Sequence, residues 1–147
     1  MTIRVDTSGG PETGGSPDDA SAGSGRFQIS MARLELLNRS AVHLISGRLT
    51  PVCPSFGKPV HELDAGALVR EIQEFHADAD DFIRYDMPIK EIVFRTLLAQ
   101  GNRPMALSDL HRELTGRWSN ALRPISIEES LLRRVLETDT YYGFARV

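Results

Sequence analysis

The sequence of 147 residues predicts a mainly helical α+β fold with a short two-stranded sheet. The first observation is an apolar stripe over residues 88–100, which repeats at helical spacing and stops before Gly101. The second is the segment 126–129, Ser-Ile-Glu-Glu, which has the spacing of a helix capping box. The third is the aromatic end of the chain, residues 141–147, whose composition favours a strand.

Residues 1–26 form the first predicted unit, a disordered tail. Six of the 12 glycines lie between residues 9 and 25, together with Pro11 and Pro17. Such a segment buries too little apolar surface to offset the entropy lost on ordering.

Residues 27–87 form the second predicted unit, and its start supports two interpretations. Apolar residues from Met31 to Ile45 keep a helical spacing, whereas Phe27, Ile29 and Met31 alternate as in a strand. A helical segment and a β-hairpin that turns at residues 38–40 therefore both stay open.

The rest of this unit contains a loop and an acidic helix. Three prolines and Gly57 predict irregular structure over residues 50–59. Asp64 predicts a helix start, and the helix is expected to break near His76. Its apolar face is Leu68, Ile72, Phe75, Ala79 and Phe82. From residue 61 to 86, eight carboxylates oppose two arginines, so the other face is acidic.

Residues 88–147 form the third predicted unit. We expect a helix over about 88–100, a strand over 105–107 and a helix over about 109–118, capped by Ser108, with Leu110, Leu114 and Trp118 on its inner face. A third helix follows the Ser126 cap and buries Ile127, Leu131, Leu132, Val135 and Leu136. The strand within 141–147 is expected to pair with 105–107.

This order of elements resembles winged helix-turn-helix domains, and within them the HARE-HTH group. The similar segments are Arg103-Pro104-Met105-Ala106-Leu107-Ser108, Pro124-Ile125-Ser126-Ile127 and Phe144-Ala145-Arg146-Val147, and the resemblance covers about 60 of 147 residues. It implies a winged-helix-like C-terminal unit in a DNA-associated or regulatory module. One departure is that a full wing needs two strands after the third helix, and only one is predicted here.

The resemblance makes the third helix the candidate DNA contact. Its outward face offers Ser130, Arg133 and Arg134 as DNA-binding candidates, and Arg103, Arg117 and Arg123 flank the same helices. Against this, Arg133 can pair with Glu129 and Glu137 at i,i+4 spacing, and the net charge of −3 provides no overall basic field. A protein-protein interaction or adaptor domain that does not bind nucleic acid is the alternative.

Other chemistry has weaker support in the sequence. The segment 76–81 offers imidazole and carboxylate groups, but it lacks the glycine and distal glutamate of a calcium loop. Cys53 could be activated by His43, His61 or His76, yet a structural cysteine is expected. We therefore expect no catalysis, no metal and no cofactor. The single cysteine and the lack of an apolar leader or span predict a cytoplasmic protein without membrane contact.

Overall fold

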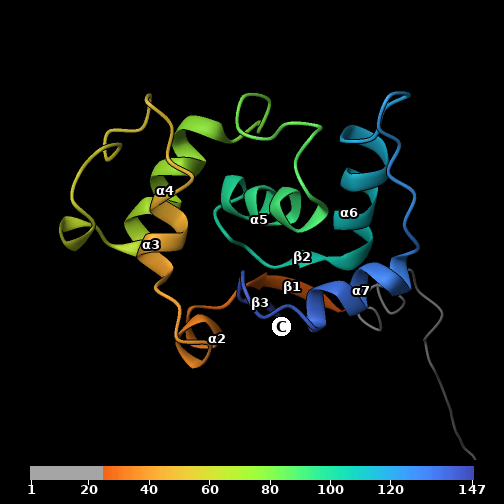
Figure 1. Ribbon diagram of the computed structural model, residues 1–147, viewed down its shortest axis with the longest axis horizontal. Helices are drawn as coiled ribbons and strands as arrows, with labels where there is room; N and C mark the ends of the chain where they lie inside the picture. The colour runs from red at the N-terminus through yellow and green to blue at the C-terminus, as the bar shows by residue number, and fades with distance from the viewer. Residues whose placement is uncertain (1–24) are drawn as a thin grey trace, which may run out of the picture.

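The computed structural model describes residues 25–147, in which helices dominate and a small antiparallel sheet completes the fold (Figure 1). The predicted class, mainly α with a short sheet, is confirmed. In chain order the elements are β1 (Arg26–Ile29), α2 (Met31–Leu36), α3 (Ala41–Ser46), the 3-10 turn η2 (Val60–Glu62), α4 (Ala65–His76), α5 (Ile89–Ala99), β2 (Met105–Ala106), α6 (Leu107–Arg112), the π-helical turn η3 (Glu113–Arg117), α7 (Glu129–Glu137) and β3 (Phe144–Arg146).

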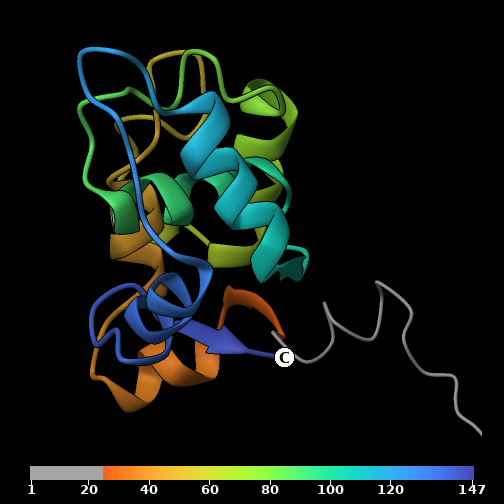
Figure 2. The same ribbon diagram turned by 90° about the vertical axis from the view of Figure 1, so that its right-hand side faces the viewer.

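Helix α5 lies at the centre of the molecule. Helices α3 and α4 flank it on one side and α6 on the other, with the sheet below (Figure 1). The turned view shows the sheet, α2 and α7 gathered at one end, beneath the remaining helices (Figure 2). Eight of the 11 residues of α5 are buried, including Glu91 and Thr96. The helix agrees with the predicted 88–100, and Gly101 follows it with the positive φ of 75° that a C-cap favours.

The sheet has three strands in the order β2-β1-β3, with both pairs antiparallel. The predicted two-stranded pairing of 105–107 with 141–147 is therefore wrong, because β1 lies between those strands. Strand β3 is also shorter than predicted. Residues 141–143 leave the sheet because the Asp139 carboxylate accepts their backbone N–H groups at 2.8–3.2 Å.

Strand β1 resolves part of the ambiguity over residues 27–49. Phe27 and Ile29 are buried on one face, as their alternation predicts, and two short helices follow the strand. Asn102, in the turn before β2, supports the strand, since its side chain accepts from Ile29 N and donates to Ile29 O, both at 2.8 Å. The stretch is thus a strand and a helical segment, and the hairpin is not formed.

The loop over residues 50–59 and helix α4 follow the sequence-based prediction closely. The loop consists of turns, Asp64 Oδ2 accepts the N–H of Ala67 at 3.0 Å as an N-cap, and α4 ends at His76. The prediction for Phe75 is wrong, because its side chain is 40% exposed. Three residues of about 100° each place Phe75 about 60° around the helix from Ile72. The buried stripe runs through Leu68, Ile72 and His76 and widens toward Val69, on the opposite flank from Phe75.

Helix α6 begins earlier than predicted, at Leu107, and Ala106 occupies the N-cap position with no side-chain bond. The predicted cap by Ser108 is therefore wrong, since α6 begins at the residue that directly follows β2. Leu110, Leu114 and Trp118 are all buried, as predicted. The last turn widens into η3, which contains Gly116, a residue that weakens a regular helix end.

Helix α7 begins at Glu129 and has no side-chain cap, so the predicted capping box at Ser126 is wrong. The preceding residues are held from outside the helix: Ser119 Oγ accepts from Ile125 N at 2.8 Å, and His111 Nε2 meets Ile127 O at 2.6 Å. These bonds keep residues 125–127 extended. The shorter helix buries Leu132 and Leu136, whereas Ile127 and Val135 are half-buried and Leu131 is 47% exposed.

The buried apolar side chains of residues 25–147 form one cluster that extends from Phe27 to Phe144. The predicted tail 1–26 lies outside the described residues except for its last two positions. There the prediction is wrong, because Gly25 is buried and Arg26 opens β1. In the described part of the chain, every helix is too short or too polar to cross a membrane.

Candidate functional site

The predicted contact residues on α7 lie at its solvent side. Ser130 and Arg134 are exposed and Arg133 is half-buried. The predicted pairs of Arg133 with Glu129 and Glu137 are not formed, because Glu137 Oε2 lies 3.4 Å from Arg146 Nη1 instead. Within residues 25–147, the side chains of Arg133 and Arg134 have no hydrogen bond or ion pair. These two guanidinium groups are therefore available to an external ligand.

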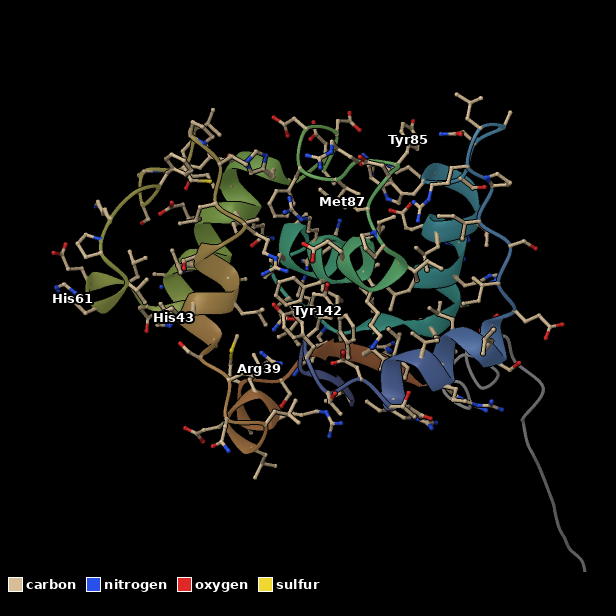
Figure 3. The ribbon with its side chains drawn as sticks, in the orientation of Figure 1. Arg39, His43, His61, Tyr85, Met87 and Tyr142 are labelled. Atoms are coloured by element: carbon tan, nitrogen blue, oxygen red, sulfur yellow. The ribbon has the colours of Figure 1, made fainter. Side chains whose placement is uncertain are left out.

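Two other predicted contact residues bind the protein itself. Arg117 forms an ion pair with Asp80 at 2.5 Å, donates to the carbonyl of Asp78, and covers the ring of Trp118 at 4.9 Å. Arg123 donates to the carbonyls of Tyr85 and, at 2.8 Å, Met87, the two residues labelled between α4 and α6 (Figure 3). Both arginines fix loops next to α5, which is a structural role.

Arg103 lies at a separate place, the turn before β2. It is exposed, and its Nε donates to Gln100 O at 3.2 Å. It shares a cavity of about 350 Å³ with Arg26, which the sequence did not single out, and with Asp109. Of the six candidates, three therefore lie on α7, Arg103 lies in the turn before β2, and Arg117 and Arg123 bond to loops of the protein itself.

A buried ionic cluster around Glu91 was not predicted. Arg48 approaches the carboxylate in bidentate fashion, with Nε 3.0 Å from Oε2 and Nη2 2.7 Å from Oε1. Arg95 Nε donates to Oε2 at 2.7 Å, and Tyr142 Oη donates to Oε1 at 2.8 Å. The cluster therefore joins the turn after α3, the first two turns of α5 and the segment before β3.

The environment of this cluster shifts three pKa values. Burial raises the pKa of Glu91, but the hydrogen bonds from Arg48, Arg95 and Tyr142 lower it more, and the result is a pKa of about 2. Burial and the bond to Glu91 raise the pKa of the Tyr142 phenol. Burial lowers the pKa of Arg48, but the hydrogen bond and charge of Glu91 raise it further, to a net increase. At neutral pH the cluster thus holds one carboxylate, two guanidinium groups and a neutral phenol.

One sequence signal could have indicated this cluster. Helix α5 is apolar nearly all round, and such a helix is buried on every side. A carboxylate within it must then have charged partners, since an unpaired buried charge is very costly. The signal identifies Glu91, but it does not identify partners that are 43 and 51 residues away.

A second polar network surrounds His76, whose ring is 1% exposed. Its Nε2 lies 2.6 Å from Thr50 Oγ1 and its Nδ1 lies 2.8 Å from Asp81 Oδ1, while Cys53 Sγ is 3.6 Å from the same hydroxyl. The order hydroxyl, imidazole, carboxylate matches that of an activated nucleophile. A nucleophile must reach its substrate, however, and the imidazole ring is almost fully enclosed. The network instead has a structural role, because it bonds the loop over residues 50–59 to the end of α4.

The chemistry considered for Cys53 and for residues 76–81 takes a different form in the structure. Cys53 is buried and contacts Thr50, which separates it from His76. Asp81 bonds to His76 and Asp80 to Arg117, so these carboxylates face different partners. Among residues 25–147, no group of three or more His, Cys, Asp and Glu side chains is placed to hold a metal ion.

Comparisons with protein-family models, curated proteins and solved structures found no match for this chain.

Proposed function

We propose that the protein is a DNA-associated regulatory module that contacts duplex DNA through α7, without catalysis and in the cytoplasm. The observation that carries the proposal is the pair Arg133 and Arg134, which have no ionic partner within residues 25–147. Most other arginines near them are engaged: Arg117 and Arg123 hold loops, and Arg146 pairs with Glu137.

The distribution of charge also supports this proposal. Residues 1–24 contain four carboxylates and one arginine, which account for the net charge of −3. Residues 25–147 therefore contain equal numbers of acidic and basic side chains, so repulsion from phosphate is weaker than the whole-chain charge indicates. The Glu137–Arg146 pair further compensates one of the carboxylates on α7.

The order of α5, β2, α6, α7 and β3 resembles a winged helix-turn-helix domain, and this resemblance suggests α7 as the helix that meets the groove. The third strand of the sheet is β1, which precedes these elements in the chain. Under this proposal α7 supplies most of the contact.

A protein-interaction function is the second candidate, and exposed apolar residues favour it. Leu122, in the loop before α7, is 98% exposed, and Leu131 on α7 is 47% exposed. Leu131 shares α7 with Arg133 and Arg134, and a helix that exposes apolar and basic side chains suits a protein partner as well as it suits DNA.

Fluorescence anisotropy with a labelled duplex of mixed sequence, at about 50 mM salt and upward, tests the DNA proposal. The double variant R133A/R134A should bind more weakly, and the slope of log K against log salt should flatten by about 0.9 for each lost phosphate contact. The matched control is R70A/R84A, which removes two exposed arginines from the acidic α4 region and should leave the slope unchanged.

Two outcomes contradict the proposal. One is the lack of any salt-sensitive association by the intact protein. The other is an equal loss of binding in both double variants, which would show that only total charge matters. In either case the protein-interaction function replaces it.

A further inference from the structure

We propose that the cavity at the turn between α2 and α3 binds a small oxyanion, either a phosphate or a carboxylate. The cavity has a volume of about 310 Å³. That is the lower end of the range for small-molecule sites. Its lining residues are Asn38, Arg39, Ser40, His43, Leu44, Arg48 and Tyr141.

The cavity wall is built from segments that are far apart in the chain. Residues 38–40 form the turn, and Asn38 has the left-handed φ of 58° that reverses the chain there. Tyr141 comes from the segment before β3, about a hundred residues later. Arg39 lies in the turn between α2 and α3, His43 lies on α3, and Tyr142 lies beneath α5 (Figure 3).

The charge of the lining favours an anion. It includes two guanidinium groups and one imidazole, and none of the seven lining residues is acidic. The cavity near Arg103 differs in this respect, because Asp109 stands among its two arginines. Behind the wall, Glu91 is shared between Arg48 and Arg95, so that ionic cluster keeps an excess of one positive charge.

Arg48 is already held in position to receive an anion. Three of the five N–H groups of a guanidinium are used here, two by Glu91 and one by the carbonyl of Leu44 at 2.9 Å. The other two have no partner within residues 25–147. Because the side chain is fixed before a ligand arrives, binding loses little rotamer entropy.

Arg39 forms the outer part of the site. Its guanidinium lies 4.1 Å above the centre of the Tyr141 ring, and its Nε donates to Thr140 O at 3.4 Å, the one hydrogen bond of this side chain to residues 25–147. The remaining N–H groups can donate to an oxygen in the cavity. Ser40 adds a hydroxyl, since its oxygen accepts from His43 N at 3.2 Å while its own hydrogen stays available.

These donors select the ligand class. Guanidinium groups bind phosphate and carboxylate oxygens through paired, charge-assisted hydrogen bonds. Among the seven described lining residues Leu44 is the single aliphatic one, so a compact polar ligand fits better than a large apolar one. Both a phosphate ester and a carboxylic acid satisfy this chemistry, and the experiment separates them.

The test is a titration of the full-length protein, labelled with ¹⁵N, followed by amide chemical shifts. The probes are inorganic phosphate, acetate and adenosine 5′-monophosphate, each against sodium chloride at equal ionic strength. We expect saturable shifts with at least one oxyanion, centred on residues 38–44 and 141. R39Q should weaken binding at least five-fold, whereas R70Q, which changes an exposed arginine on α4, should leave it unchanged.

Arg39 is the chosen position because it is exposed, whereas Arg48 belongs to the buried cluster and its removal could unfold the protein. The proposal is overturned if none of the three probes gives saturable shifts, if the shifts centre elsewhere, or if R39Q and R70Q bind like the unaltered protein. Whether phosphate or acetate binds more tightly identifies the ligand group.

Loss of DNA binding in R133A/R134A is independent of this result, so the two proposals can fail separately.

Discussion

Glu91 shows how a single residue can combine burial with full ionisation. Its carboxylate accepts four hydrogen bonds, two from Arg48 and one each from Arg95 and Tyr142. Those donors replace the water that burial removes, and the two cations favour the charged form. The aromatic rings of Phe94 and Tyr142 lie 5.0 and 5.8 Å from the Arg48 guanidinium and complete its surroundings.

This arrangement predicts a specific acid sensitivity. The folded pKa of Glu91, about 2, is below the ordinary value of 4.5, so its contribution to stability is complete above about pH 4.5 and disappears as pH falls toward 2. The shift corresponds to on the order of 3 kcal/mol at neutral pH. Urea unfolding at a series of pH values should show Glu91→Gln less stable by about 3 to 5 kcal/mol at pH 7, with a smaller loss on acidification.

Glu74→Gln is the control for this measurement, because Glu74 is exposed on α4. It should reproduce both the stability and the acid profile of the unaltered protein. An acid profile of Glu91→Gln parallel to that of the unaltered protein would mean that other carboxylates cause the acid loss.

Helices and strands differ in how far their own residues determine them. Asp64 caps α4 through Ala67 N, whereas Ser126 forms no cap at α7. Asp64→Ala should therefore lower the free energy of unfolding by about 1 kcal/mol. Ser126→Ala should change it by less than about 0.5 kcal/mol, as an exposed substitution does. Chemical denaturation of both variants measures the difference, and equal losses would show that the α7 cap forms in solution.

The same contrast explains what the sequence predicted. Helix α5 and the break of α4 at His76 follow from local spacing and capping, so the prediction was correct there. The pairing of β1 and the late start of α7 depend on Asn102, Ser119 and His111, which lie 73, 6 and 16 residues from the groups they bond. For the candidate sites, periodicity placed Arg133 and Arg134 outward, but only the folded chain brings Arg39 and Arg48 to Tyr141.

At the scale of the whole molecule, β1 joins the two ends of the described chain. It pairs with β2 and β3, and it places Phe27 and Ile29, each no more than 1% exposed, in the common core. We predict that a chain starting at Gly25 keeps a cooperative thermal transition, because it retains all of these contacts. A chain starting at Ser30 should lose that transition, since two large core side chains are then missing.

A substitution on the same strand makes the prediction quantitative without removing backbone. Ile29→Ala should lower the free energy of unfolding by about 2 to 5 kcal/mol, because its side chain is buried opposite Phe144 in the β1–β3 pair. Gln28→Ala, one position away on the half-exposed face, should change it little. If the two substitutions have equal effects in chemical denaturation, β1 does not alternate between core and solvent, and the sheet order described for the folded chain does not hold in solution. If Ile29→Ala alone is destabilising, β1 stabilises the fold through the side chains that it packs against the C-terminal strand β3.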